Sequence, residues 1–566
     1  MGSMTEPADR VYLGGSVFTA GWTTSRRLAL AVSGGAISAL GSDAEVREFA
    51  GPRTEIVDLA GGLLAPGFQD AHVHPMVAGL EMLRCQLDGT SSEQECLDCV
   101  AAYVASHPTQ GRPPESGAAR SSVTEFWVTG GGWSMESFPG GSPTRQMLDS
   151  VASDRPVALI NRDHHGYWVN SRALALAGIE RSTADPTFGR IERDDDGTPT
   201  GVLHESAMDL VDRIIPATSA RDQMAGLLTA QEILLSLGVT AWQDAAVGNV
   251  FGLDDALSVY LDAARTGRLV ARVVGALWWD RNRGREQIPE LIERRAAGSA
   301  GRFRATTVKV MQDGVAENFA AAMTGPYLDR CGCPTDNSGM SFVDPVALRD
   351  YVTRLDSEGF QVHFHALGDR AVRESLDAVE SARDSNGPSD NRHHLAHLQV
   401  VHPQDIARFT ALGATANIQP LWAAHSRQMD ELTIPFLGAE RAQWQYPFAD
   451  LLGAGTAIAA GSDWPVSSPN PLEGMQVGVT RRAPDEDRAA FLPTNAMSLA
   501  DVFAAYTAGS ARVNHLDEIT GAIVEGHRAD LVVLDRDPFQ YPPDEIARAK
   551  VRSTYIDGEC VYSVDG

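Results

Sequence analysis

The chain has 566 residues, of which 43% are hydrophobic, and its formal net charge is −27. So acidic a surface repels phosphate backbones and anionic lipid, which argues against nucleic acid and membranes as partners. The sequence has no run of about 18 apolar residues, so no transmembrane helix is predicted. We expect a small-molecule substrate as the partner, and the composition also permits a homodimer.

The two ends of the chain have the same character. Residues 10–60 contain short apolar stretches between glycine-rich turns, and residues 521–535 and 551–563 repeat this pattern, which is typical of β-hairpins. We therefore predict one small composite β-sandwich domain made of residues 4–62 and 516–566. The opening sequence MGSMTEPADR lacks the basic and apolar segments of a secretory signal, so we expect a cytoplasmic protein.

The middle of the chain alternates apolar strands with helical segments. Eight such units predict an α/β fold, a closed parallel (β/α)8 TIM barrel over residues 63–515. The predicted strands are residues 67–74, 238–245, 269–279, 305–314, 361–369, 393–400, 413–420 and 456–465.

A long segment separates the first predicted strand from the second. It contains two strand-like stretches, residues 124–133 and 156–168, and a connection of this length needs structure of its own. We predict that residues 76–236 form an insertion that covers the mouth of the barrel. Within it, residues 107–122 have the composition of a mobile tip.

The six cysteines are too few for a disulfide framework in so long a chain. Cys96 and Cys99 have the spacing of half a zinc site, as do Cys331 and Cys333, but no second CxxC pair accompanies the first. We predict free cysteines.

Polar residues gather where the predicted strands end. His72 and His74 follow an apolar run and stand two apart, so on a strand both point to the same side and can chelate one metal ion. Catalytic residues of such barrels lie at the carboxyl ends of the strands. The polar residues on or at the ends of the predicted strands include His72, His74, Lys309, His365, His397 and Asp463.

This pattern resembles the amidohydrolase superfamily of metal-dependent hydrolases. Within it, the sequence is similar to the YtcJ-like amidohydrolases, which include N-substituted formamide deformylases. The resemblance covers almost the whole chain. The motifs that carry the closer similarity are GGGW (130–133), WVNSRAL (168–174), GVTAWQDA (238–245), VKVMQDG (308–314), HALGDRAV (365–372) and GSDWPVSSPNPLEGM (461–475).

The resemblance implies a site for two divalent metal ions, zinc by preference. Imidazole nitrogen and carboxylate oxygen suit such ions. It also implies that Lys309 is carbamylated, because a carbamate is anionic and can bridge two ions. A lysine within an apolar strand is costly to bury charged, which favours the neutral, reactive amine. The alternative is a lysine that reaches solvent from the strand edge. The implied ligands are His72, His74, Lys309, His365, His397 and Asp463.

Several neighbouring residues have two interpretations. His363 shares a strand face with His365, but the motif after His365 matches the family ligand, so His363 is expected behind the ligands or in the core. Asp463 can hold a metal ion and can also accept the proton of the attacking water. Asp313 is expected to orient a neighbouring group.

The insertion is expected to supply substrate contacts. His165 matches a position near the pocket of relatives, and Trp133 could form an apolar wall. For both residues, packing of the insertion is the alternative. Asp244 and Glu205 are expected to be structural.

The predicted function is hydrolysis of a C–N amide bond of a small molecule, with an N-substituted formamide as the first substrate hypothesis and Asp463 as general base and acid. Deamination and ester or carbamate hydrolysis are alternatives that the same ligands would serve. A third hypothesis is an inactive barrel that only binds a ligand, although such barrels lose metal ligands and all six positions are filled here.

Overall fold

Eight parallel strands form a nearly closed barrel at the centre of the computed structural model, which describes residues 7–108, 127–250, 252–484 and 486–564. Every predicted barrel strand is present, so the predicted α/β barrel is confirmed. In sheet order the strands are β7 (Phe68–Val73), β14 (Val239–Val247), β15 (Arg272–Trp278), β17 (Phe303–Met311), β18 (Gln361–Ala366), β19 (His394–His397), β20 (Thr415–Ile418) and β21 (Ile458–Ala460).

Two hydrogen bonds join the first and last strands just beyond the end of β21. The Asp463 amide donates to the carbonyl of His72 over 2.8 Å, and the His74 amide donates to the carbonyl of Trp464 over 2.9 Å. These two backbone hydrogen bonds hold the segment with His72 and His74 beside the segment with Asp463, so three predicted metal ligands lie next to one another.

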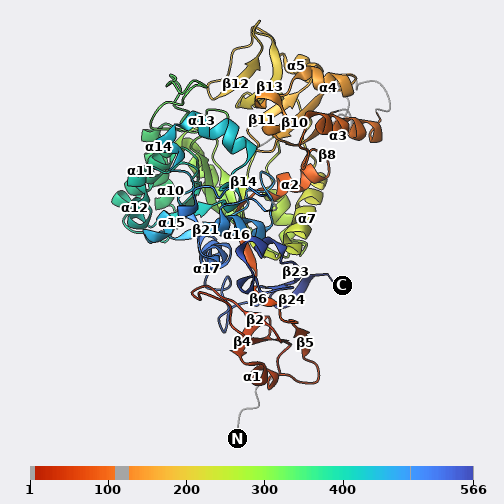
Figure 1. Ribbon diagram of the computed structural model, residues 1–566, viewed down its shortest axis with the longest axis vertical. Coiled ribbons are helices and arrows are strands. Elements are labelled where there is room, and N and C mark those ends of the chain that lie inside the picture. Colours follow the sequence, from red (N-terminus) through yellow and green to blue (C-terminus); the bar gives the residue numbers. More distant parts are fainter. Residues whose placement is uncertain (1–6, 109–126, 251, 485, 565–566) are drawn as a thin grey trace.

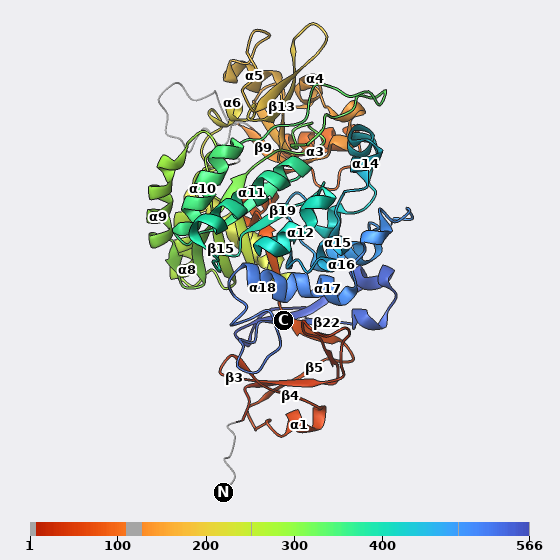
Figure 2. The same cartoon turned by 90° about the vertical axis from the view of Figure 1, so that its left-hand side faces the viewer.

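The two faces of a barrel strand have different chemistry. On β17, Val308 and Val310 belong to the main hydrophobic cluster, where they meet apolar side chains of the surrounding helices. The alternate residues Thr307 and Lys309 take part in polar contacts inside the barrel. The helices around the barrel (Figure 2) include α7 (Ala220–Ser236), α8 (Leu257–Arg265), α9 (Ile288–Ala297), α10 (Pro345–Ser357), α11 (Asp369–Asn386), α12 (Pro403–Leu412) and α16 (Pro471–Thr480).

Polar side chains fill part of the barrel interior, where branched apolar residues are usual. The Gln243 amide group donates to the side-chain oxygen of Gln361 over 3.0 Å and to that of Asn514 over 3.2 Å. Thr307 donates to the same oxygen of Gln361 over 2.8 Å. These hydrogen bonds compensate for the loss of solvent around buried amides.

A second sheet is built entirely from the segment between the first two barrel strands. Its order is β12-β13-β11-β10-β9-β8, and Figure 1 shows it at the end of the barrel opposite the chain termini. Residues 109–122 of the predicted tip lie outside the described residues. The strands are β8 (Cys85–Gln86), β9 (Val128–Trp133), β10 (Val157–Asn161), β11 (Gly166–Val169), β12 (Gly189–Arg193) and β13 (Pro199–Glu205), with helices α3 (Glu93–Ser106), α4 (Arg145–Val151) and α5 (Ser171–Ala177).

Both ends of the chain contribute to one further sheet, of order β2-β6-β22-β23-β24. A four-stranded sheet, β4-β3-β1-β5, comes from the N-terminal residues alone, and side chains of both sheets share one hydrophobic cluster. The exact domain boundaries remain a prediction. The strands are β1 (Arg10–Leu13), β2 (Ser16–Val17), β3 (Ala29–Ser33), β4 (Ala36–Gly41), β5 (Glu55–Asp58), β6 (Leu63–Pro66), β22 (Leu531–Leu534), β23 (Val551–Ile556) and β24 (Glu559–Ser563).

A charged cluster connects the barrel to these terminal sheets. Arg272 on β15 is 2.6 Å from a carboxylate oxygen of Asp530 and 2.6 Å from one of Asp557. Arg302 and Arg528 also pair with Asp557. No helix in the described part of the chain could span a membrane, and none of the six cysteines forms a disulfide.

Candidate metal centre

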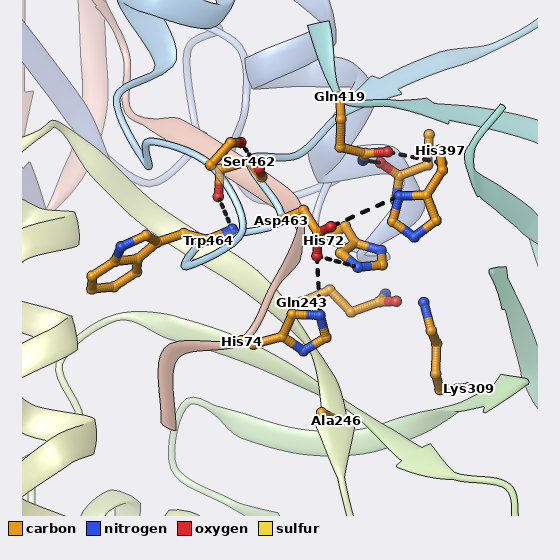
Figure 3. Close-up of polar contacts among 12 residues, drawn as sticks. His72, His74, Gln243, Ala246, Lys309, His397, Gln419, Ser462, Asp463 and Trp464 are labelled. Carbon is orange, nitrogen blue, oxygen red and sulfur yellow. Dashed lines mark hydrogen bonds and ion pairs between the residues drawn. The ribbon is translucent and has the colours of Figure 1, made fainter. Parts of the chain in front are cut away.

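His72 and His74 converge on one carboxylate. His72 is near the end of β7, and His74 precedes helix α2 (Pro75–Met82), whose first residue is a proline. The Nε2 atoms of His72 and His74 lie 3.0 and 3.1 Å from Oδ1 of Asp463 (Figure 3). The His-x-His spacing therefore places both imidazoles on the same side, as predicted.

Asp463 follows β21 in a left-handed backbone conformation, with φ of 57°. Such a conformation costs energy in a residue with a side chain and is frequent at functional sites. The preceding Ser462 donates its hydroxyl to the buried carboxylate of Asp70, which fixes this turn. Burial disfavours the ionised form of Asp463, but the imidazoles of His72, His74 and His397 outweigh it and hold the pKa of Asp463 well below its usual range.

His397 gives the clearest sign that this site binds a ligand. It is 1% exposed, and neither of its ring nitrogens has a hydrogen-bond partner in the described structure. Its Nδ1 lies 3.9 Å from Oδ2 of Asp463, its backbone amide donates to Gln419 over 2.8 Å, and its ring stacks on Trp422. Like Asp463, it has a positive φ, 79°. A buried imidazole without partners is costly unless something binds it.

The donor set fits a metal ion. One ligand atom each from His72, His397 and Asp463 lies within 4.8 Å of the others. Burial, together with nearby Lys309, lowers the pKa of His72 to about 3, and burial also places the pKa of His397 well below its usual value. Both imidazoles are thus neutral at physiological pH, as metal ligation requires.

Lys309 points into the same region from β17 and is 1% exposed (Figure 3). It forms no ion pair among the described residues, and its Nζ lies 3.4 Å from Nε2 of His363. Burial lowers the pKa of Lys309 to about 7. The chain has only two lysines, and the other, Lys550, is exposed. The position of Lys309 is therefore compatible with a neutral amine that reacts with carbon dioxide.

His365 lies on the other side of His397, with ring centroids 4.5 Å apart. Its Nδ1 is 3.3 Å from Oδ1 of Asp313. The Asp313 carboxylate also accepts hydrogen bonds from the amides of Ala322, Leu367 and Gly368. Asp313 thus orients His365, in agreement with its expected role.

A chain of hydrogen bonds lies behind the ligands, and the sequence predicted only one of its members, His363. His363 Nε2 is 2.8 Å from Nδ1 of His72, and His363 Nδ1 is 2.7 Å from Oε1 of Gln243. The same oxygen lies 3.0 Å from Nε2 of His394, whose Nδ1 accepts from Asn417. His363 is behind the ligands, as expected, whereas the parts of Gln243, His394 and Asn417 were not predicted. Partners of this kind fix the orientation of metal-binding imidazoles.

One cavity of about 550 Å³ reaches all six predicted ligands. Residues 162–165, in the loop between β10 and β11, form part of its wall. His165 is there as predicted, and its Nδ1 lies 2.9 and 3.0 Å from the two carboxylate oxygens of Glu205. Glu205, expected to be structural, holds the His165 ring beside His365, with ring centroids 5.5 Å apart.

The structure corrects the prediction for Trp133. This residue is 1% exposed and packs in the core of the inserted sheet against Phe138 and Trp168. Its indole N–H donates to the carbonyl of Leu159. The neighbouring Gly130 allows this packing, because a Cβ there would lie 2.0 Å from the carbonyl oxygen of Cys85. Trp133 stabilises the insertion and is not part of the cavity wall.

The barrel and this cluster of histidines and carboxylate at its strand ends are those of metal-dependent hydrolases. The chain belongs to the amidohydrolase family, whose model matches residues 55–562. A solved structure of an uncharacterized metal-dependent hydrolase from Pyrococcus furiosus superimposes with a TM-score of 0.68 at 25% identity, covering 94% of this chain and 99% of that one.

Curated relatives match over nearly their whole lengths. Protein LONG AFTER FAR-RED 3 of Arabidopsis thaliana is 31% identical over 99% of this chain and 93% of its own. Putative amidohydrolase YtcJ of Bacillus subtilis is 28% identical over 98% and 99%. N-substituted formamide deformylase of Arthrobacter pascens is 26% identical over 100% of both. These matches confirm the predicted resemblance.

Proposed function

We propose that this hydrolase cleaves the C–N amide bond of a small molecule, with an N-substituted formamide as the first candidate. The observation that carries this proposal is the buried, ionised Asp463 among His72, His74 and His397 at the floor of a cavity. The similarity to a formamide deformylase over the full length supports the choice of substrate. The size of the cavity suits a small molecule, and we propose neither nucleic acid nor membrane as a partner.

The residues present fit two divalent ions, for which we propose zinc. His72, His74, His365, His397 and Asp463, with a carbamate on Lys309, would hold the ions, and one ligand atom each from His72, His397 and Asp463 lies within 4.8 Å of the others. When bound, such ions lower the pKa of water and polarise a carbonyl group.

The chain's own groups would perform the proton transfers. Asp463 is ionised at neutral pH, so it can accept a proton from the attacking water and pass it to the leaving amine nitrogen. Burial disfavours the charged form of His165, but Glu205 outweighs it and raises the pKa of His165, and the imidazolium form could donate a hydrogen bond from Nε2 to the substrate carbonyl oxygen. Residues 162–165 narrow access to the ligands and so limit bulk water there.

The test combines metal analysis with a substrate panel. We expect about two ions per chain at saturation, loss of activity with a chelator, and turnover of formamides in preference to esters and aminated heterocycles. Asp463→Asn should reduce kcat at least about a thousandfold, whereas Asp384→Asn, an exposed residue on α11, should leave it unchanged.

Normal turnover in Asp463→Asn would refute the proposed role of this residue. A single bound ion with an unmodified Lys309 would instead favour a deaminase. A pure protein with neither metal nor hydrolysis would indicate a binding barrel.

A further inference from the structure

The cavity wall holds two carboxylates, Asp163 and Glu317, that form no ion pair with lysine or arginine among the described residues. Asp163 lies in the loop between β10 and β11, and Glu317 lies in the loop after β17, so the insertion and the barrel each contribute one. Asp163 accepts a hydrogen bond from the Gln428 amide over 3.0 Å, and Glu317 accepts one from the Thr433 hydroxyl. Both donors are neutral. Within the described residues, neither carboxylate pairs with lysine or arginine.

These two carboxylates are close enough to act on each other. Burial raises the pKa of Glu317, and the charge of Asp163 raises it further. Both also act on Tyr446, which lines the same cavity. A third carboxylate of the wall, Asp88, has its pKa raised by burial. Asp163 and Glu317 have no arginine or lysine counterion among the described residues, so a cation that enters this part of the cavity would favour their ionised forms.

Two basic residues that flank Asp163 in the chain, Arg162 and His165, already have carboxylate partners. Arg162 lies 3.6 Å from a carboxylate oxygen of Glu136 and also donates to Ser134. His165 is held by Glu205. By contrast, Glu486, another carboxylate of the wall, pairs with Arg488 over 2.9 Å. Asp163 and Glu317 accept hydrogen bonds from neutral donors only, so both carboxylates can still bind a cationic group of a ligand.

Aromatic rings line the cavity that these carboxylates share with the metal ligands. Trp422, Tyr446 and Trp464 are all part of the cavity wall. Trp422 stacks on His397, the buried imidazole whose two nitrogens have no partner and which faces the same cavity. A bound metal ion would satisfy this imidazole, so the aromatic rings and the two carboxylates are the parts of the wall that remain for the substrate. Aromatic faces beside carboxylates are typical of sites for organic cations.

We propose that the substrate carries a positively charged amine or guanidinium group at the end away from the amide to be cleaved, and that Asp163 and Glu317 bind this group. The inference rests on the proposed amide hydrolysis. Charge-assisted hydrogen bonds to two partly buried carboxylates favour the cation, and an anionic substituent at this end is repelled. The rest of the substrate packs against the aromatic wall.

A binding experiment tests the proposal without catalysis. N-(4-aminobutyl)methanesulfonamide and N-pentylmethanesulfonamide differ in one terminal group and contain no amide to hydrolyse. Isothermal titration of the metal-loaded protein should show the cationic compound binding at least about tenfold more tightly. Equal affinities, or no binding of either compound, would overturn the proposal.

Variants show where the preference arises. Glu317→Gln and Asp163→Asn keep their neutral hydrogen bonds but lose the charge, so each should reduce the preference and the double variant should abolish it. Glu486→Gln removes one charge from a carboxylate that is already paired and should keep the preference. Unchanged binding of the pentyl compound serves as the folding control. A preference that survives the double variant would overturn the assignment.

The matching formamides separate this proposal from the proposed function. N-(4-aminobutyl)formamide should be hydrolysed with kcat/KM at least about tenfold above that of N-pentylformamide. If neither is hydrolysed but the sulfonamide preference holds, amide hydrolysis fails and the cation site stands. If both are hydrolysed equally and the sulfonamides bind equally, the cation site fails and amide hydrolysis stands.

Discussion

His72 and His363 are 291 residues apart in the chain, yet their ring nitrogens lie 2.8 Å from each other. The direction of this hydrogen bond follows from the next partner. Oε1 of Gln243 can only accept, so Nδ1 of His363 carries a hydrogen, and its Nε2 accepts from Nδ1 of His72. With a metal ion bound, the lone pair of His72 would thereby be on Nε2, the atom that faces Asp463, where it could bind the ion.

We predict that His363→Leu weakens metal binding about 10–100-fold, because His72 loses the group that fixes its tautomer and ring orientation. Competition with a chelator on the purified protein measures this affinity. His107→Gln, a change at an exposed position after α3, is the matched control and should have wild-type affinity. An unchanged affinity in His363→Leu would show that His363 only fills space.

The scarcity of lysine makes the proposed carbamate directly measurable. After exchange with ¹³C-bicarbonate, the protein should give one carbamate resonance, because Lys309 is buried and its pKa is lowered to about 7, where much of the amine is neutral. The resonance should disappear in Lys309→Met and remain in Lys550→Arg. The metal content of Lys309→Met should fall below that of the wild type. A resonance that depends on Lys550 would contradict this assignment.

Trp133→Ala should destabilise the protein by about 3–5 kcal/mol, as expected for loss of a large buried side chain, with little change in KM for the enzyme that stays folded. Trp422→Ala should raise KM and change the free energy of unfolding little, because this ring lies on the cavity wall and stacks on His397. Denaturant unfolding and steady-state kinetics distinguish the two variants. A large KM effect in Trp133→Ala alone would restore its predicted role in binding.

Trp133 also shows where inference from sequence ends. The strand-end histidines were predictable, because each follows a short apolar run whose period determines which way the side chain points. The direction of Trp133 depends instead on how β9 packs beside β8 and β10, and the run GGGW does not contain that information. Gln243 escaped prediction for a related reason. Its contacts with His363 and His394 exist only because three distant strands reach the barrel axis at the same height.

Stability in acid should depend on Asp557. Burial raises the pKa of this carboxyl, but Arg528, Arg272 and Arg302 outweigh burial and lower it below its unfolded value. The stabilisation is therefore complete above the unfolded pKa, near 4, and is lost as pH falls through the lower folded value. We expect Asp557→Asn to lower the melting temperature at pH 7 but to reduce its fall below pH 4. Parallel melting curves for both proteins across this range would contradict the prediction.

The hydrogen bonds between Asp463 and His72 and between His74 and Trp464 have a consequence for the order of assembly. The first histidines leave the ribosome almost 400 residues before Asp463 does, and until the last strand docks they have no carboxylate partner. A high-affinity metal site therefore cannot exist on a partly synthesised chain. Metal uptake would mark the completion of folding, and a chain that stops before residue 460 would remain without metal however well its earlier strands form.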